Sequence, residues 1–128
     1  MTEKKYLKNE YIEMRIEDGV FWGRYLNGVV IDEECAIKVM NDRELLCGNT
    51  PYATIWDCRE VAYWTKSARS FQNSDLNYRL MKAGAIVYTE SHVTTIIINF
   101  FLNFSKPPIP AQFFTSLESA HKWIQKYK

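Results

Sequence analysis

Apolar and charged residues alternate near the start of the chain, and this alternation predicts a β-hairpin. Over residues 12–17 every second residue is apolar, which is the period-two pattern of a strand with one buried face. The dipeptide Asp18-Gly19 follows, and it favours a two-residue turn because both central positions need a positive φ. Residues 20–26 are then the returning strand, and residues 6–7 are a candidate for a short additional strand.

The pattern becomes helical after residue 31. Asp32 is a candidate N-cap, and the two glutamates that follow it are favourable near the positive end of a helix dipole. Gly48 stands where a helix needs a residue with a left-handed backbone to end. These signals predict a helix over residues 32–47, with an apolar stripe formed by Ala36, Val39, Met40 and Cys47.

Strands and helices alternate over the rest of the chain. Thr65 or Ser67 is the candidate cap of the first helix in this part, and the stretch from Thr115 to Glu118 matches a capping box for the last. The expected strands are 52–58, 83–88 and 112–114, and the expected helices are 66–72, 75–82, 91–105 and one starting near 115. The resulting order, β-β-α-β-α-β-α-β-α, predicts an α/β fold with a single mixed, mainly parallel sheet and flanking helices, in which the first strand is antiparallel.

The expected helix 91–105 contains no charged residue. A surface helix normally carries charges opposite its apolar face, so this one is either covered on nearly all sides or exposes an apolar patch. Three interpretations stay open: core packing, an interface with a second copy or another protein, and contact with a lipid or other hydrophobic ligand. The candidate interface residues are Ile97, Phe100, Phe101 and Phe104.

A hydrophobic ligand would need a cavity of about 300 Å³ or more between this helix and the sheet. The tryptophans Trp22, Trp56 and Trp64 are candidates to line it. The alternative is that these three side chains fill the core.

Five segments follow one another in a characteristic order and spacing: Asp57-Cys-Arg59, Thr65-x-x-Ala68-Arg69, Ala83-x-Ala85-Ile-Val, Ile-Ile-Asn99-Phe-Phe, and Phe114-x-Ser116-Leu-Glu118 with Trp123. Together with the order of elements, they make most of the chain resemble the STAS domain, the fold of bacterial anti-sigma-factor antagonists. The likeness is greatest to the uncharacterised SpoIIAA-like bacterial proteins related to those antagonists. The resemblance implies a regulatory or protein-interaction domain without catalytic activity. STAS-like sheets also resemble those of cellular lipid-transfer domains, which is an analogy at the level of the fold.

The antagonists carry an Asp-Ser-Ser/Thr-Gly segment after the central strand, and a partner kinase phosphorylates its serine. The corresponding residues here, 63–68, lack both the Asp-Ser pair and the glycine. Thr65 and Ser67 are the hydroxyl groups in this neighbourhood, where a phosphate at a helix N-terminus is physically well placed. The alternative is that both hydroxyls serve only as helix caps.

Ligands of open α/β sheets bind beyond the carboxyl ends of the parallel strands. At this edge an enzyme would need His92 within hydrogen-bond reach of a nucleophile such as Ser91 and of an orienting acid such as Asp57. The alternative is that Asp57 pairs with Arg59 or accepts backbone N–H groups. The chain contains no GxSxG, HExxH or GxxxxGK[ST] motif, so no catalytic residue is predicted. The candidate ligand or phosphate edge consists of Asp57, Arg59, Thr65, Ser67, Ser91 and His92.

The composition narrows the function classes further. The 128 residues carry 16 basic and 15 acidic side chains, and a net charge of +1 argues against an electrostatically driven nucleic-acid binder. Cys35, Cys47 and Cys58 are odd in number and too widely spaced for CxxC motifs, which fits a reducing cytoplasm. His92 and His121 lack the spacing of paired ligands, so no metal or cofactor is predicted.

The sequence as a whole predicts one STAS-like domain over residues 1–128, in a cytoplasmic bacterial protein without a transmembrane segment. The leading hypothesis for its function is a non-catalytic regulatory or protein-interaction domain that acts as a homodimer or with a protein partner. The alternative is a module that binds a small hydrophobic molecule or a lipid. A small enzyme at the edge where the strands end is the third hypothesis. Cys58 is expected to be a buried residue of the core.

Overall fold

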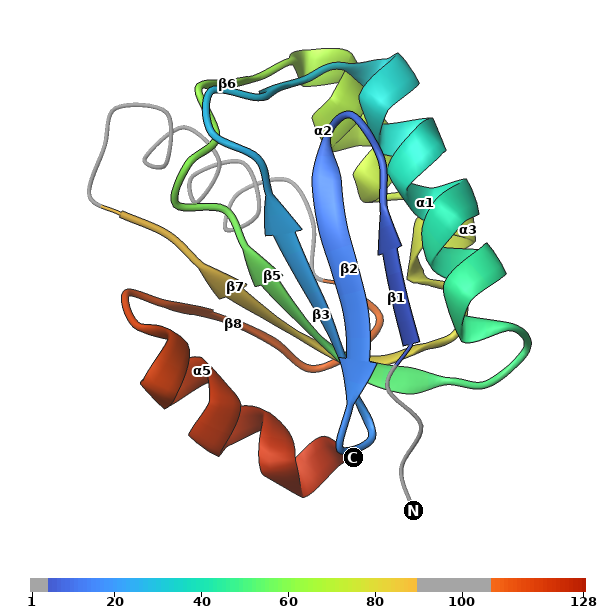
Figure 1. Cartoon of the computed structure of the whole chain (residues 1–128), viewed down its shortest axis with the longest axis vertical. Helices are drawn as coiled ribbons and strands as arrows, with labels where there is room; N and C mark the ends of the chain where they lie inside the picture. The colour runs from blue at the N-terminus through green and yellow to red at the C-terminus, as the bar shows by residue number, and fades with distance from the viewer. Residues whose placement is uncertain (1–4, 90–106) are drawn as a thin grey trace.

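The fold is built on one six-stranded sheet with helices on both faces (Figure 1). The computed structural model describes residues 5–89 and 107–128. The strand order is β1-β2-β3-β5-β7-β8; β1 and β2 pair antiparallel, as do β2 and β3, and every pair from β3 onward is parallel. The strands are β1 (Lys5–Lys8), β2 (Ile12–Glu17), β3 (Val20–Tyr25), β5 (Tyr52–Asp57), β7 (Met81–Val87) and β8 (Ala111–Phe114). The predicted α/β class with a mainly parallel sheet is confirmed.

The β2–β3 hairpin forms as the alternating pattern predicts. Asp18 and Gly19 have φ angles of 53° and 76°, so both central residues of the turn take the left-handed backbone that this turn requires. Glu17 and Val20, which lie on either side of the turn, pair with each other, and this pairing fixes the register of the two strands. Every second residue of β2 is buried, and the short additional strand expected at residues 6–7 is β1.

Within the described residues, three helices cover one face of the sheet and one helix covers the other (Figure 1). The first group consists of α1 (Glu33–Cys47), α2 (Lys66–Gln72) and α3 (Asp75–Tyr78). The opposite face carries α5 (Leu117–Ile124), which a 3₁₀ turn extends over Gln125–Tyr127. The helix expected at residues 91–105 lies outside the described residues. Among the residues described, no helix has both the length and the apolar character needed to cross a membrane.

The capping signals explain where the helices begin and end. The carboxylate of Asp32 accepts the backbone N–H of Cys35 at 2.8 Å, and Gly48 ends α1 with a φ of 63°. Thr65 caps α2 by accepting the N–H of Ala68 at 3.1 Å. Two predictions need correction. Ser116, rather than Thr115, caps the last helix by accepting the N–H of Ser119, and α3 ends at residue 78 because β7 already begins at 81.

The structure also contains a two-stranded parallel sheet that the sequence pattern did not predict. Its strands are β4 (Val30–Ile31) and β6 (Tyr63–Trp64). Val30 lies opposite Tyr63 in this pair, and both side chains are about half exposed. The small sheet therefore ties the start of α1 to the start of α2, since each helix follows one of its strands.

Side-chain parity divides the core between the two faces of the sheet. Ala53 and Ile55 of β5 pack with α5, whereas Trp56, between Ile55 and Asp57, packs on the side of α1. The larger apolar core lies on the face that α1, α2 and α3 cover.

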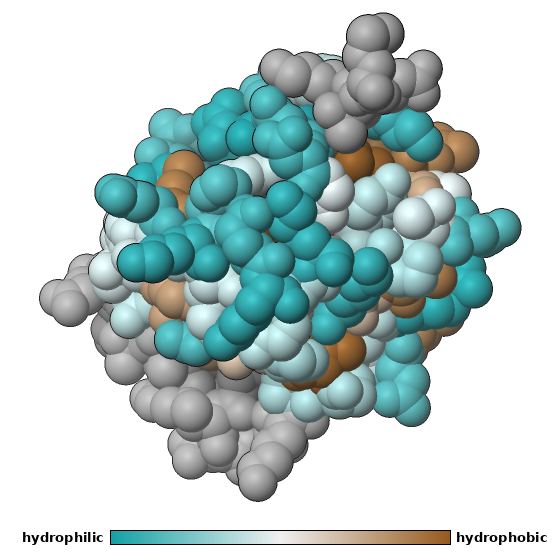
Figure 2. All heavy atoms as spheres, turned by 90° about the horizontal axis from the view of Figure 1, so that it is seen from below, coloured by the Kyte–Doolittle hydropathy of each residue, from teal (hydrophilic) through white to brown (hydrophobic). Residues whose placement is uncertain are grey.

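The end of the molecule that carries the β2–β3 turn is mostly hydrophilic, with apolar atoms only in small separate patches (Figure 2).

Candidate ligand cavity

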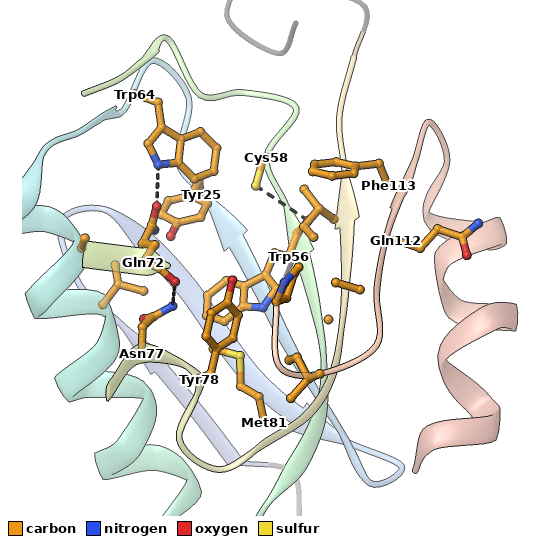
Figure 3. Close-up of a pocket in the computed structure, with 17 residues that line it drawn as sticks. Tyr25, Trp56, Cys58, Trp64, Gln72, Asn77, Tyr78, Met81, Gln112 and Phe113 are labelled. Atoms are coloured by element: carbon orange, nitrogen blue, oxygen red, sulfur yellow. Dashed lines mark hydrogen bonds between the residues drawn. The ribbon is translucent and has the colours of Figure 1, made fainter. Parts of the chain in front are cut away.

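A cavity of about 340 Å³ lies between the sheet and the helices α1, α2 and α3 (Figure 3). Strands β3, β5, β7 and β8 form its sheet side, and the three helices and the chain around them form the opposite side. The described residues that line it are Tyr25, Ala36, Val39, Trp56, Cys58, Trp64, Gln72, Asn77, Tyr78, Met81, Gly84, Ile86, Pro107, Ile109, Ala111, Gln112 and Phe113.

Strand parity decides which sheet residues reach this cavity. Successive side chains of a strand point to opposite faces, so Ile86 of β7 and Phe113 of β8 face the cavity while Val87 and Phe114 pack toward α5. Gln112 lines the cavity, yet its side chain points away from the other lining residues (Figure 3).

Small residues keep the space open. Gly84 of β7 lines the cavity without a side chain, and a Cβ built there would meet no heavy atom closer than the Thr54 hydroxyl at 3.7 Å. Ala36 of α1 and Ala111 of β8 line other parts of the wall. These small residues leave space between the sheet and the helices, and the larger aromatic side chains of the wall border that space.

Hydrogen bonds fix the indole rings of the wall. The Nε1–H of Trp56 donates to the Thr54 hydroxyl at 3.0 Å, and that hydroxyl donates to the Ala83 carbonyl at 2.7 Å. The Nε1–H of Trp64 donates to Oε1 of Gln72 at 2.6 Å. Since both indole N–H groups bond within the wall, the rings turn apolar surface toward the cavity.

The end of the cavity near α3 contains amide and hydroxyl groups. The side-chain Nδ2 of Asn77 donates to the backbone carbonyl of Gln72 at 2.9 Å, and the Tyr78 hydroxyl lies 3.3 Å from Oδ1 of Asn73. Arg43 of α1 lies behind this end and donates through Nη2 to the carbonyls of Asn77 and Arg79 at 3.0 and 3.2 Å. The guanidinium therefore fixes α3 against α1.

Burial keeps the titratable groups of the cavity in their neutral forms. It raises the pKa of the Tyr25 hydroxyl well above its usual value, and a hydrogen bond with Gln72 opposes this rise in part. Burial also raises the pKa of the Cys58 thiol, and it raises the pKa of Tyr78 to about 12. No Asp, Glu, Lys, Arg or His is among the described lining residues. This part of the wall is therefore uncharged at neutral pH.

At the predicted edge, where the parallel strands end, Asp57 and Arg59 form an ion pair with each other. Arg59 donates from Nε and Nη2 to the two oxygens of Asp57 at 2.9 and 2.7 Å, and its backbone N–H lies 3.2 Å from Oδ1. The side-chain hydroxyls of Thr65 and Ser67 lie 3.1 Å apart, and Thr65 acts as a helix cap. These contacts match the structural alternative given for Asp57 and Thr65. Ser91 and His92, the remaining members of this candidate site, lie outside the described residues.

The three tryptophans proposed to line a cavity divide between the two faces. Trp56 and Trp64 line the cavity described above, whereas Trp22 does not. Trp22 directly follows Phe21, which packs in the core on the α1 side, so Trp22 points to the opposite face, where its ring stacks on His121 at 5.4 Å. The guanidinium of Arg15 covers the same indole at 4.6 Å. The candidate interface residues Ile97, Phe100, Phe101 and Phe104 lie outside the described residues, and their role stays a prediction.

Sequence analysis did not identify the polar end of the cavity. Gln72 begins the stretch 72–75, where the helical periodicity breaks, and Asn77 lies in the helix expected at 75–82. The break predicts only that one helix divides into two. Their signal is weak because amide residues are common at helix ends and in turns. Within the described residues there is no cluster of three or more side chains that could ligate a metal ion.

The fold is an α/β fold of the SpoIIAA-like type. A solved structure with this fold, an uncharacterised protein from the DUF3478 family of Shewanella loihica PV-4, is similar over 97% of both chains with a TM-score of 0.57. The two sequences are 16% identical, so this likeness concerns the fold. The chain belongs to the family described as a domain of unknown function, DUF7793, which matches residues 14–128. A search of the curated proteins found no match.

Proposed function

We propose that this domain binds a small, largely apolar molecule in the cavity between the sheet and the helices α1, α2 and α3. The cavity of about 340 Å³ carries this proposal. Its volume falls within the range of about 300–1,000 Å³ that small-molecule sites occupy, and its described wall combines apolar and aromatic side chains with a few amide groups. Binding without catalysis is supported by the described lining, which offers no carboxylate or imidazole as a general acid or base.

The neutral fluorescent probe N-phenyl-1-naphthylamine tests this proposal. We expect saturable binding to the wild-type protein, and we expect Gly84→Val to weaken it at least about tenfold because the new methyl groups enter the cavity. Gln125→Val is the matched control, since Gln125 follows α5 on the opposite face of the sheet and is not among the described lining residues, so the affinity should not change. Absence of saturable binding to the wild type, or equal affinity in Gly84→Val and Gln125→Val, would contradict the proposal.

A protein-interaction surface is the second candidate, and the small β4–β6 sheet favours it. Val30 and Tyr63 lie opposite each other and are 48% and 52% exposed, so two large apolar side chains form a joint surface at the start of α2. The candidate partner is a second copy of this chain, which would make the domain a homodimer with a regulatory or interaction role.

Size-exclusion chromatography with light scattering tests the dimer. We expect the wild type to be dimeric at tens of micromolar and Tyr63→Glu to be monomeric, because a charge at the contact would have to be buried unpaired. Leu45→Glu is the control, since Leu45 is 75% exposed on α1. A monomeric wild type, or a dimer that Tyr63→Glu leaves intact, would rule out this surface.

A further inference from the structure

The volume of the cavity limits the size of the ligand. A dry apolar cavity of about 150 Å³ holds one benzene ring, so about 340 Å³ accommodates roughly two or three fused rings. This inference rests on the proposed function, since it describes the molecule that the same cavity binds.

The aromatic side chains of the wall favour a flat ligand. Tyr25 lies between two indoles, with ring centroids 6.4 Å from Trp56 and 6.1 Å from Trp64. Phe113 borders the cavity on the sheet side, and Tyr78 borders it on the side of α3 (Figure 3). An aromatic ligand would make offset or edge contacts with several of these rings, each of which adds about 0.5–1.5 kcal/mol beyond the burial of area.

The wall also selects against an ionised group. No charged side chain is among the described lining residues, so a carboxylate or an ammonium group placed against this part of the wall would lose its hydration without gaining a counter-charge from it. The indole N–H groups of Trp56 and Trp64 already donate within the wall and do not compensate an anion.

Gln72 supplies a polar group whose orientation the structure determines. An indole N–H only donates, so the Gln72 atom that faces Trp64 is the oxygen, and the amide NH₂ points away from this bond. The Gln72 oxygen accepts from Trp64, and the side-chain amide also bonds the Tyr25 hydroxyl. An amide NH₂ has two N–H donors, so the second one suits an uncharged acceptor such as a hydroxyl or carbonyl oxygen.

We propose that the cavity selects an uncharged, flat aromatic molecule of two or three fused rings, and that Gln72 is the residue that orients its polar group. The proposal names a ligand class distinct from long-chain fatty acids and from aromatic acids, both of which carry a carboxylate at neutral pH.

Competition with N-phenyl-1-naphthylamine on the wild-type protein tests the ligand class. The competitors are 2-naphthol, which is uncharged at neutral pH, 2-naphthoate, which has the same rings and an anionic group, and decanoate, an anionic chain. We expect 2-naphthol to bind at least about tenfold more tightly than either anion, which corresponds to about 1.4 kcal/mol. Equal or tighter binding of 2-naphthoate or of decanoate would overturn the inference. If the probe binds and this preference is absent, the inference alone fails; if the probe does not bind, the proposed function fails.

Gln72→Glu tests the orienting residue. The new carboxylate still accepts from Trp64, but it removes the amide donor and adds a charge, so we expect the affinity for 2-naphthol to fall at least about fivefold. Gln125→Glu makes the same chemical change in the 3₁₀ turn after α5, outside the described lining, and its affinity should equal that of the wild type. Near-ultraviolet circular dichroism verifies that each variant is folded. An unchanged affinity in folded Gln72→Glu, or an equal loss in Gln125→Glu, would overturn the role of Gln72.

Discussion

Arg43 shows how one residue supports the wall of the cavity. Its side chain is only 1% exposed, although it stands in the middle of helix α1 and makes no ion pair with an acid among the described residues. Burial lowers the pKa of its guanidinium, and two backbone carbonyls near α3 accept its Nη2 hydrogen bonds. Arg43 thus stabilises the fold by fixing the position of α3, whose residues Asn77 and Tyr78 line the cavity.

Substitution of Arg43 should therefore destabilise the protein. We expect Arg43→Ala to lower the free energy of unfolding by about 2–4 kcal/mol, because it leaves a space and two carbonyls without their donor. Arg43→Met should cost about half as much, since it keeps most of the aliphatic packing. Urea denaturation followed by tryptophan fluorescence measures both changes.

A control on the same helix separates this effect from a general loss of positive charge. Lys38 is exposed and pairs with Asp42 at 3.4 Å, so Lys38→Ala should change the free energy of unfolding by no more than about 0.5 kcal/mol. If Arg43→Ala is as stable as Lys38→Ala, then Arg43 does not fix α3.

At the scale of elements, the sequence predicts those whose signals are local. The β2–β3 turn follows from Asp18-Gly19, and the limits of α1 follow from Asp32 and Gly48, because each of these residues acts on its own neighbours. The β4 and β6 strands escape prediction because two residues show no periodicity, and their pairing depends on segments far apart in the chain.

The cavity could be predicted only in part, because it depends on which side chains of the sheet and of the helices face one another in the folded chain. Trp56 and Trp64 are recognisable as large residues that could line a cavity, but the space itself arises where Gly84 faces the helices. Trp22 packs against the core of the α5 face, which is the alternative left open for it, because its position directly after Phe21 puts it on the opposite face of β3. Arg43 was missed because a charged residue within a helical pattern ordinarily indicates a solvent-exposed face.

At the scale of the whole molecule, the cavity lies on the face of the sheet that α1, α2 and α3 cover. The edge where the parallel strands end is a different place, where Asp57 pairs with Arg59, and a ligand site there stays a prediction. The α5 face contains a separate packed cluster, including Ala120 and Ile124 of the helix itself. Variants on the α5 face can therefore change stability without touching the cavity.

The buried thiols and phenols of the α1–α3 face give the whole molecule a characteristic response to alkaline pH. Burial raises the pKa of Cys35 from 9.0 to about 12, raises the pKa of Tyr78 from 10.0 to about 12, and raises that of Tyr25 well above its usual value. Between the unfolded and the folded pKa, the folded protein keeps protons that the unfolded chain has lost. Stability is therefore complete below about pH 9 and falls as the pH rises above it.

We expect the free energy of unfolding to decrease by up to about 1.4 kcal/mol per pH unit for each such group between about pH 9 and about pH 11. Thermal unfolding in the presence of a reductant measures this slope. Tyr78→Phe should make it shallower by removing one titrating group. A stability that stays constant across this range, or an unchanged slope in Tyr78→Phe, would show that these groups do not titrate differently in the folded and unfolded states.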